Sequence, residues 1–457
     1  MRLSDPACLF LLIGIPYGLT LLFVTPPFQV PDEDAHFLRA YSVSEFQLIN
    51  KRRPDTAGDF VPASIVQTTW ALTADIPQHP ERKTSVASIR QELHRPFDPD
   101  DRVFVPFINT VLYSPVPYLP QALGMAVARL CRLSPLLMMY CGRLANLLVW
   151  LVLVHLAIRL LPAFKWVMLF LALMPMAMFL AASLSPDAPT AAMVFLFIAL
   201  VLRAGAGDDL PFRRRRFLLA VFVLGLLIAL AKNAYAVVPL LLFGAVQPTK
   251  LGSRRQYTWA AVLFYASCIA VVLIWSGISA TLYVPVPHAN PREQLRWILE
   301  APFSHYVLVV LSNLWHHFGT VLDTFVGVLG WLDTSIPAPL IHCYLYAIAF
   351  VFLADHDEGH ALKVRQRAMM LAAFIAFLLI IYTYQYLTFT PPRSDYIWSV
   401  QGRYFIPVAP LLLFALSTNR LRITADDRLA RWAPAFVVAI QAAYLGVTVR
   451  TLVARYF

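Results

Sequence analysis

Long apolar runs recur along the whole chain and constrain its fold more than any other feature. Each is close to the roughly 20 residues that a helix needs to cross a bilayer core. Lipid offers no hydrogen bonds to a peptide backbone, so such runs cross as helices. We therefore predict an all-α polytopic membrane protein with about 11 transmembrane helices, forming one integral membrane domain over residues 1–457. The runs cover residues 7–25, 135–158, 166–184, 188–204, 217–231, 234–247, 257–282, 336–354, 368–388, 403–418 and 432–453.

The composition excludes a soluble domain and gives little support to nucleic-acid binding. Charged residues make up only 14% of the chain, against roughly 25% in soluble domains. The net charge of +11 has a simpler explanation, because basic residues gather in the cytoplasmic loops of membrane proteins. The five cysteines are scattered without metal-ligand spacing, which is typical of buried free thiols.

Basic residues are unevenly divided between the short loops and so orient the chain. An N-terminus in the cytoplasm puts the four arginines at 213–216, together with Arg254, Arg255 and Lys363, in cytoplasmic loops. This choice satisfies the positive-inside rule. Residues 26–133 then form a long first extracytoplasmic loop with interfacial helices, and the remaining transmembrane helices lie within residues 135–453.

Two stretches leave the path through the membrane open at this point. Residues 113–133 form either a spanning helix or an interfacial one. We favour the interfacial helix, because prolines crowd its start and a crossing would move residues 213–216 outside. Residues 217–247 form either one tilted helix, with Lys232 at the membrane midplane, or two short helices that turn near Lys232. We favour the two helices.

The first outer loop opens with an acidic cluster immediately after a spanning helix. The cluster contains Asp32, Glu33 and Asp34, followed by His36. Carboxylates this close raise one another's pKa, and a carboxylate with such a pKa can act as a general base. A cluster of carboxylates also suits a divalent cation such as Mg²⁺ or Mn²⁺. The alternative is a solvated acidic turn that caps a helix beginning near Ala35.

Four further outer stretches carry polar side chains beside apolar helices. Ionisable residues in such places are candidates for function. The alternatives are helix capping for Asp187 and snorkelling to lipid headgroups for Lys232 and Arg403. By the assigned topology all of these stretches face the same side of the membrane. The candidates are Asp187; Lys232 with Tyr235; Trp331 with Asp333; and Arg403 with Gln401 and Tyr404.

The ordered set of motifs resembles a known family. The motifs are Pro31-Asp32-Glu33-x-x-His36, Ser185-Pro186-Asp187-Ala188 and Gln401-Gly402-Arg403-Tyr404-Phe405. They look like the signature of a bacterial family of predicted membrane proteins, the domain of unknown function 2142, over nearly the full length. That family in turn resembles the GT-C superfamily of glycosyltransferases.

The resemblance carries expectations about fold, site and substrate. It implies a GT-C-like helix bundle in the bacterial inner membrane and a donor sugar on a polyprenyl phosphate. It also implies a catalytic carboxylate in the first outer loop, where Asp32 and Glu33 match, and a second acid in the next outer loop, where Asp187 matches. Asp34 stands where the family often has proline, so the choice of base within the triplet stays open.

The residue types fit sugar transfer independently of the resemblance. A base deprotonates the acceptor hydroxyl, and Lys or Arg holds the leaving phosphate. We expect Asp32, Glu33 and Asp187 to be catalytic or to hold a divalent cation, and Lys232 and Arg403 to bind the donor phosphate. Removal of the Asp32 or Glu33 carboxylate should abolish transfer without loss of stability.

The expected partners follow from the same chemistry and from the resemblance. They are a polyprenyl-phosphate-sugar donor, a glycan or lipid-linked acceptor, and the lipid bilayer, with no nucleic acid. The active site is expected on the extracytoplasmic side.

Two other classes of function stay open from the sequence. A transporter or flippase of lipid-linked saccharides would also be polytopic, but its polar residues should line a path within several helices. A non-catalytic subunit of a polysaccharide assembly complex leaves the outer motifs without a role. Convergence of Asp32, Glu33, Asp187, Lys232 and Arg403 on one outer cavity favours the enzyme, and a cavity at the midplane favours the transporter.

Overall fold

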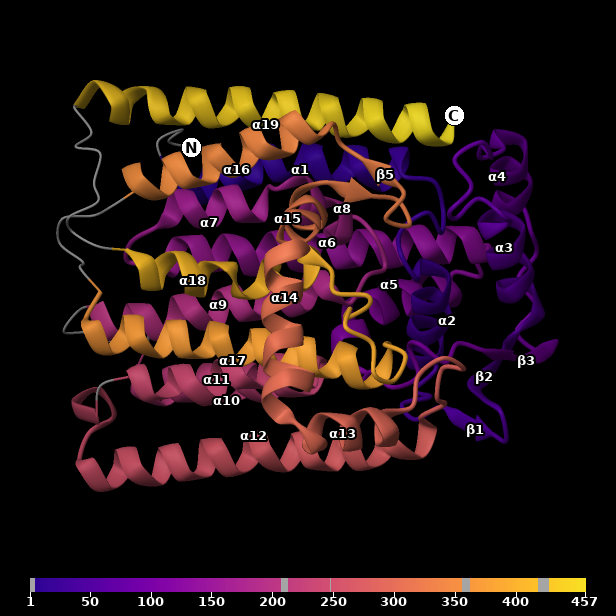
Figure 1. Cartoon of the computed structure of the whole chain (residues 1–457). Helices are drawn as coiled ribbons and strands as arrows, with labels where there is room; N and C mark the ends of the chain where they lie inside the picture. Colours follow the sequence, from indigo (N-terminus) through magenta and orange to yellow (C-terminus); the bar gives the residue numbers. More distant parts are fainter. Residues whose placement is uncertain (1–4, 207–212, 247, 356–361, 418–426) are drawn as a thin grey trace.

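Long helices lie side by side in one bundle, and shorter elements gather at one end of it (Figure 1). The computed structural model describes residues 5–206, 213–246, 248–355, 362–417 and 427–457. Within these residues six helices are long and apolar enough to cross a membrane. They are α1 (Pro6–Val24), α6 (Pro135–Leu160), α9 (Asp187–Ala206), α12 (Arg254–Leu282), α17 (Val364–Thr388) and α19 (Asp427–Tyr456).

The other five apolar runs form shorter or interrupted helices. Run 166–184 breaks at Met174, whose ψ of 140° leaves the helical region, because Pro175 follows and disfavours a helical residue before it. Runs 234–247 and 403–418 end on residues outside the described part of the chain. The elements are α7 (Lys165–Ala172), α8 (Pro175–Ala181), α10 (Arg214–Ala231), η2 (Asn233–Ala236), α11 (Val237–Leu242), η3 (Phe243–Ala245), η4 (Pro248–Leu251), α16 (Ala338–Ala354), η6 (Gly402–Val408) and α18 (Ala409–Leu416).

The chain reverses direction at Lys232. Asn233 Nδ2 donates a hydrogen bond of 3.0 Å to Ser276 Oγ near the end of α12. Phe243 stacks on Phe264, nearer the start of α12, with ring centroids 4.5 Å apart. The segment after Lys232 therefore runs antiparallel to α12, and the prediction of two short helices is confirmed. Lys232 lies at the turn between them.

Residues 26–133 form a separate layer, the platform, at one end of the bundle (Figure 1). Its three strands make an antiparallel sheet in the order β1-β2-β3. Its last helix packs closely on α6, since a Cβ at Gly124 would lie 2.3 Å from the Cys141 carbonyl oxygen. The elements are α2 (Glu33–Ser44), β1 (Lys51–Arg53), β2 (Thr56–Pro62), α3 (Ala63–Thr73), α4 (Val86–Leu93), β3 (Arg102–Pro106), η1 (Val116–Tyr118) and α5 (Leu119–Leu130).

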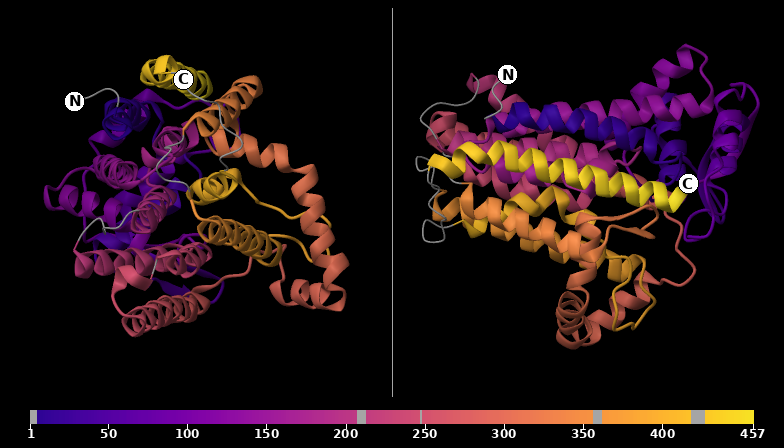
Figure 2. Two further views of the ribbon diagram at one scale, coloured as in Figure 1. Left: turned by 90° about the vertical axis from the view of Figure 1, so that its left-hand side faces the viewer. Right: turned by 90° about the horizontal axis from the view of Figure 1, so that it is seen from above.

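A group of short helices that the apolar runs did not predict lies between α12 and α16. The helix α14 crosses the direction of the long helices (Figure 1), and the group covers one flank of the bundle (Figure 2). These helices are too short to cross a bilayer, so a search for long runs misses them. They are α13 (Pro291–Glu300), η5 (Phe303–Val307), α14 (Leu308–His316) and α15 (Phe318–Val326), followed by β4 (Val328–Leu329) and β5 (Thr334–Ser335).

The helix α9 lies in the interior and carries Asp187 as its first residue. Its sequence is apolar on every side, and 94% of its most apolar window is buried, as expected for a helix without a polar face. The neighbouring helices α6, α8, α10 and α11 enclose it. Asp187 lies close to the platform, because the Leu184 amide, three residues earlier, donates a hydrogen bond of 3.0 Å to the Glu33 carboxylate of α2.

Candidate functional site

Asp32 lies where the platform meets the bundle, one residue before α2. Its backbone is left-handed, with φ 60°, and its side chain makes no capping hydrogen bond to the helix. Oδ1 instead accepts a hydrogen bond of 2.8 Å from Asn109 Nδ2, and Oδ2 lies 3.9 Å from Arg403 Nη2. The Asp32 side chain is 41% exposed. The Asp32 side chain therefore does not cap α2. Its partly exposed carboxylate faces the guanidinium of Arg403 instead.

Arg403 reaches the same place from η6, far along the chain. Its side chain is only 6% exposed, and its Nε is buried without a hydrogen-bond partner. The guanidinium carbon lies 5.5 Å from the centre of the Tyr404 ring. An unpaired buried donor is costly, so Arg403 has a bonding capacity that a bound anion can use.

Asp187 and Lys232 form an ion pair beside Arg403. Asp187 begins α9, Lys232 lies at the turn after α10, and Nζ of the lysine contacts Oδ1 of the aspartate. The ammonium lies 5.0 Å from the centre of the Tyr113 ring and 5.8 Å from that of Tyr404. Contacts with an acid and two aromatic faces hold Lys232 in place, which differs from snorkelling to headgroups.

Tyr235 ties two of these segments together. Its hydroxyl donates a hydrogen bond of 2.9 Å to the Tyr404 carbonyl oxygen, joining η2 to η6. We call Asp32, Asp187, Lys232 and Arg403 the mouth cluster. Its members come from four distant parts of the chain. The structure brings together these four of the five residues that were expected at one outer cavity, while the cavity and its side of the membrane stay predictions. Glu33, the fifth member of that expectation, lies elsewhere.

Glu33 is buried in a pair with Arg143 of α6. Arg143 Nε lies 2.8 Å and Nη2 2.5 Å from the two carboxylate oxygens of Glu33. The amide of Leu184 adds a third hydrogen bond, of 3.0 Å. The remaining Arg143 hydrogen bonds go to the carbonyl oxygens of Leu22, Thr25 and Pro26. This Glu33–Arg143 anchor joins α1, α2, α6 and the loop before α9.

Asp34 and His36 follow in the first turns of α2, and burial shifts the pKa of both. Burial raises the pKa of Asp34 to about 6, while a hydrogen bond from the Ala35 amide opposes the shift. Burial lowers the pKa of His36 to about 4, although the nearby Asp32 and Asp187 favour its charged form. His36 Nδ1 lies 2.8 Å from the Tyr118 hydroxyl. His36 is therefore neutral at physiological pH, and its hydrogen-bond partner is Tyr118 rather than a member of the cluster.

The family described as predicted membrane protein (DUF2142) matches residues 16–412. The chain belongs to this family. It is thus a membrane protein, in agreement with its apolar helices, and all four residues of the mouth cluster lie within the matched range. No curated protein and no solved structure matches the chain.

Two further candidates of this DUF2142 protein belong to a different cluster. Asp333 pairs with Arg455 of α19 at 2.9 Å, and its carboxylate also accepts a hydrogen bond from the Trp331 amide. The indole nitrogen of Trp331 donates to the Phe28 carbonyl oxygen at 3.0 Å. The structure therefore does not bring Trp331 and Asp333 into the mouth cluster. Their contacts fasten the end of α19 to the platform.

Gln401 lies beside the mouth cluster in the chain. It precedes η6, its carbonyl oxygen accepts a hydrogen bond of 3.2 Å from the Tyr404 amide, and its side-chain Oε1 is buried without a partner. Within the described part of the chain, its Oε1 therefore makes no hydrogen bond to the cluster.

The acids do not form a set of metal ligands. Across residues 5–457, apart from the undescribed segments, no group of three or more His, Cys, Asp or Glu side chains is arranged to hold a metal ion. Glu33 is engaged by Arg143, and Asp187 by Lys232. The geometry thus gives the expected Mg²⁺ or Mn²⁺ site at Asp32, Glu33 and Asp187 no support.

Sequence reasoning missed several residues of the site. Arg143 had a visible signal, because it is a lone arginine inside the apolar run 135–158, and such residues usually have a partner. Asn109, Tyr113 and Tyr118 had none. They lie in or beside the irregular segment between β3 and α5 of the platform, and only the tertiary fold brings them to Asp32, Lys232 and His36.

Proposed function

We propose that this protein is a membrane glycosyltransferase that moves a sugar from a polyprenyl-phosphate donor to a cell-surface glycan or lipid-linked acceptor on the extracytoplasmic face. One observation carries the proposal. A half-exposed carboxylate, Asp32, faces a buried guanidinium with an unused donor, Arg403, beside the buried Lys232. A base and two cations at one membrane end are what transfer from a lipid phosphate requires.

Asp32 is the base in this proposal. Its carboxylate is accessible, and Asn109 holds one oxygen while the other faces the cluster. Glu33 cannot take this role without breaking its pair with Arg143. The pKa of Asp34 is suitable for a base, but no contact with Lys232 or Arg403 supports its choice.

Lys232 and Arg403 bind the donor phosphate. The Arg403 Nε, now unpaired, donates to a phosphate oxygen, and the planar guanidinium suits such an anion. Lys232 adds a second positive charge, and Asp187 keeps it oriented. Because the cluster is largely buried, these interactions are less screened than they would be in water.

The reaction balances with these residues alone. Asp32 takes the proton of the acceptor hydroxyl, and the acceptor oxygen forms a bond to the anomeric carbon of the sugar. The bond between that carbon and the phosphate oxygen breaks. The polyprenyl phosphate leaves with the bonding electrons, and Lys232 and Arg403 stabilise its added negative charge.

The topology proposed with this function has eleven crossings in a GT-C-like bundle of the bacterial inner membrane, with the platform outside. The basic starts of α10, α12 and α17 at the end opposite the platform support it (Figure 1). Cysteine-accessibility labelling at Ser88, which is partly exposed, and at Ser253, which is exposed, should report opposite sides. Labelling of both from one side would contradict this orientation.

A reconstituted transfer assay tests the function. Proteoliposomes receive a panel of radiolabelled polyprenyl-phosphate hexoses and pentoses with a membrane glycolipid extract as acceptor. Asp32→Asn should lower the rate by about 10²–10⁴-fold, the usual cost of losing a general base, with an unchanged melting temperature. Asp100→Asn, an exposed acid of the same loop, is the matched control and should keep full activity. Transfer by Asp32→Asn at the wild-type rate, or movement of the intact donor across the membrane without transfer, overturns the proposal.

A further inference from the structure

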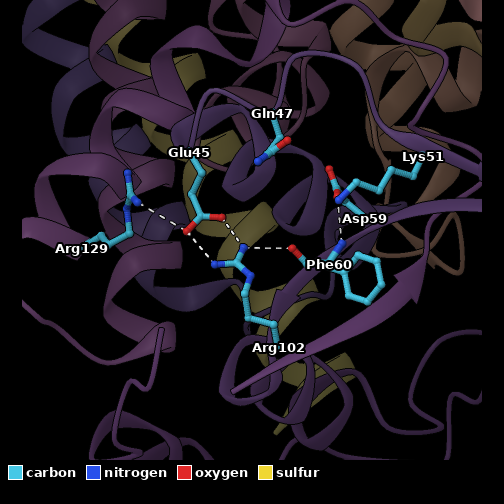
Figure 3. Close-up of a pocket in the computed structure, with 7 residues that line it drawn as sticks. All are labelled: Glu45, Gln47, Lys51, Asp59, Phe60, Arg102 and Arg129. Atoms are coloured by element: carbon cyan, nitrogen blue, oxygen red, sulfur yellow. Dashed lines mark hydrogen bonds and ion pairs between the residues drawn. The ribbon is translucent and has the colours of Figure 1, made fainter. Parts of the chain in front are cut away.

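A polar pocket lies on the platform at the end of α2 that is distant from Asp32 (Figure 3). Twelve residues of helix separate the two sites by roughly 18 Å along its axis, so this pocket is not part of the mouth cluster. Its volume of about 320 Å³ lies at the lower end of the roughly 300–1,000 Å³ of small-molecule sites. The residues that line it are Glu45, Gln47, Lys51, Asp59, Phe60, Arg102 and Arg129.

The charges of this pocket are layered, with carboxylates beneath and cations above. The side chains of Glu45 and Asp59 are 12% and 1% exposed, whereas those of Arg129, Arg102 and Lys51 are 29%, 32% and 52% exposed. Glu45 pairs with both arginines and Asp59 with Lys51, as the dashed lines of Figure 3 partly show. Three cations above two carboxylates leave an excess positive charge at the surface. The ligand that fits is an anion.

An apolar loop lies directly beside the pocket. Phe46 is 85% exposed and has a left-handed φ of 63°, an uncommon conformation for a bulky residue. Leu48 and Ile49 are exposed as well, and all three are neighbours of the pocket residue Gln47 in the chain. The buried Arg39 holds the loop, since its guanidinium donates to the carbonyl oxygens of Gln47 and Leu48 at 3.2 and 2.9 Å.

A second apolar stripe approaches the pocket from α5. Leu123, Val127 and Leu130 are exposed and lie at helical spacing on one face. Arg129 of the same helix lines the pocket and donates a hydrogen bond of 2.7 Å to the Ser44 carbonyl oxygen at the end of α2. Two of the elements that contribute to the pocket, the loop after α2 and the helix α5, therefore also carry exposed apolar side chains.

We propose that this pocket binds the phosphate headgroup of an anionic phospholipid in the outer leaflet. Apolar side chains beside cations are the pattern of an element that lies in the membrane interface, and cations at that depth attract anionic headgroups. Phe46 and the α5 stripe enter the lipid while Arg102, Arg129 and Lys51 bind the phosphate. The site fixes the platform, and with it Asp32, at a set height above the bilayer. This inference rests on the orientation proposed above, with the platform outside, but not on the proposed transferase activity.

Native mass spectrometry on the delipidated full chain tests this site. Titration with phosphatidylglycerol should show binding about tenfold or more tighter than with phosphatidylcholine, since each charge-assisted hydrogen bond contributes a factor of this order. Arg102→Gln combined with Arg129→Gln should remove the preference. Arg132→Gln is the matched control, because it removes an exposed arginine near the end of α5 that does not line the pocket.

Two further variants keep the test decisive if the double variant folds poorly. Lys51→Gln leaves the Glu45 network intact and should weaken phosphatidylglycerol binding, and Phe46→Ser should do the same without a change of charge. Soluble glycerol phosphate and an acidic tetrasaccharide of hyaluronan serve as competitors. Equal phosphatidylglycerol binding by all variants overturns the proposal. Saturable binding of either soluble anion that is insensitive to Phe46→Ser also overturns it, because the site would then serve a soluble ligand.

Discussion

The mouth cluster and the Glu33–Arg143 anchor begin at adjacent residues of the chain but have opposite properties. In the anchor, both side chains are fully buried and both carboxylate oxygens are bonded. In the mouth cluster, Asp32 is half-exposed and 3.9 Å from its nearest cation, and Arg403 keeps an unused donor. A saturated ion pair has no capacity left for a substrate, whereas the unsaturated cluster does.

This difference teaches that acidic residues in one motif need not share one role. Asp32 precedes α2 with a left-handed backbone, and Glu33 is the first residue of the helix. The change of backbone direction between them turns one carboxylate outward and the other into the bundle.

The largest effect is expected at the anchor. Arg143→Met leaves Glu33 buried without its partner and should lower the free energy of unfolding by about 3–5 kcal/mol. Glu33→Gln leaves the buried Arg143 without its ionic partner in the same way. We therefore expect this variant to be less stable than the wild type, in contrast to the expectation from the sequence. Thermal unfolding in detergent measures both. Arg403→Met should lower the free energy of unfolding far less. An equal loss of stability in Arg143→Met and Arg403→Met would contradict the distinction between a structural pair and a binding cluster.

A smaller effect is expected for donor binding at Arg403. Arg403→Ala should weaken binding of a polyprenyl-phosphate sugar in nanodiscs by roughly 1.5–3 kcal/mol, a charged hydrogen bond. Arg403→Lys should recover only part of the lost binding free energy, because lysine lacks the planar guanidinium with its paired N–H donors. The control is Arg393→Ala, an exposed arginine of the same face that pairs with Glu293 at 3.5 Å. If Arg403→Ala binds the polyprenyl-phosphate sugar with the affinity of the wild type, Arg403 does not bind the donor phosphate.

The smallest effect concerns Asp34 and its pH dependence. Because burial raises its pKa to about 6 from an ordinary 3.8, the folded state holds this proton more tightly than the unfolded state does. The stability that protonated Asp34 contributes is therefore present below pH 4 and lost as the pH rises through 6. At pH 7.5, Asp34→Asn should be more stable than wild type by about 1–3 kcal/mol. The gain should vanish near pH 4, and an equal gain at both pH values would contradict the buried carboxyl.

The sequence assigned Asp32, Asp187, Lys232 and Arg403 to one candidate site, and the structure brings these four together. Charge asymmetry and the order of the apolar runs assign these residues to one face, and the turn at Lys232 follows from the cost of burying an ammonium at the midplane. The division between Asp32 and Glu33 could not be predicted, because it depends on a backbone angle at one residue. Trp331 and Asp333 were assigned to the same candidate site, but Trp331 bonds to Phe28 and Asp333 pairs with Arg455 of α19. Sequence periodicity does not determine which neighbours these side chains contact.

The platform was predicted as a loop with interfacial helices. The structure gives it the helices α2–α5, and their place at a membrane interface stays a prediction. Its sheet was not predicted, since β1 is three residues long and no alternating pattern of that length is informative. The pocket at Glu45 and Arg102 depends on this sheet. Local sequence patterns therefore carry less information about the platform than about the bundle, where the bilayer imposes helix length.

The most direct test of the central claim is a structure of the protein in nanodiscs with a polyprenyl-phosphate-sugar analogue bound. The division between cluster and anchor predicts the phosphate within hydrogen-bonding distance of Lys232 Nζ and Arg403 Nε, with the anomeric carbon facing Asp32 and the Glu33–Arg143 pair unchanged. A phosphate bound at the membrane midplane, or one that displaces Arg143 from Glu33, would contradict it.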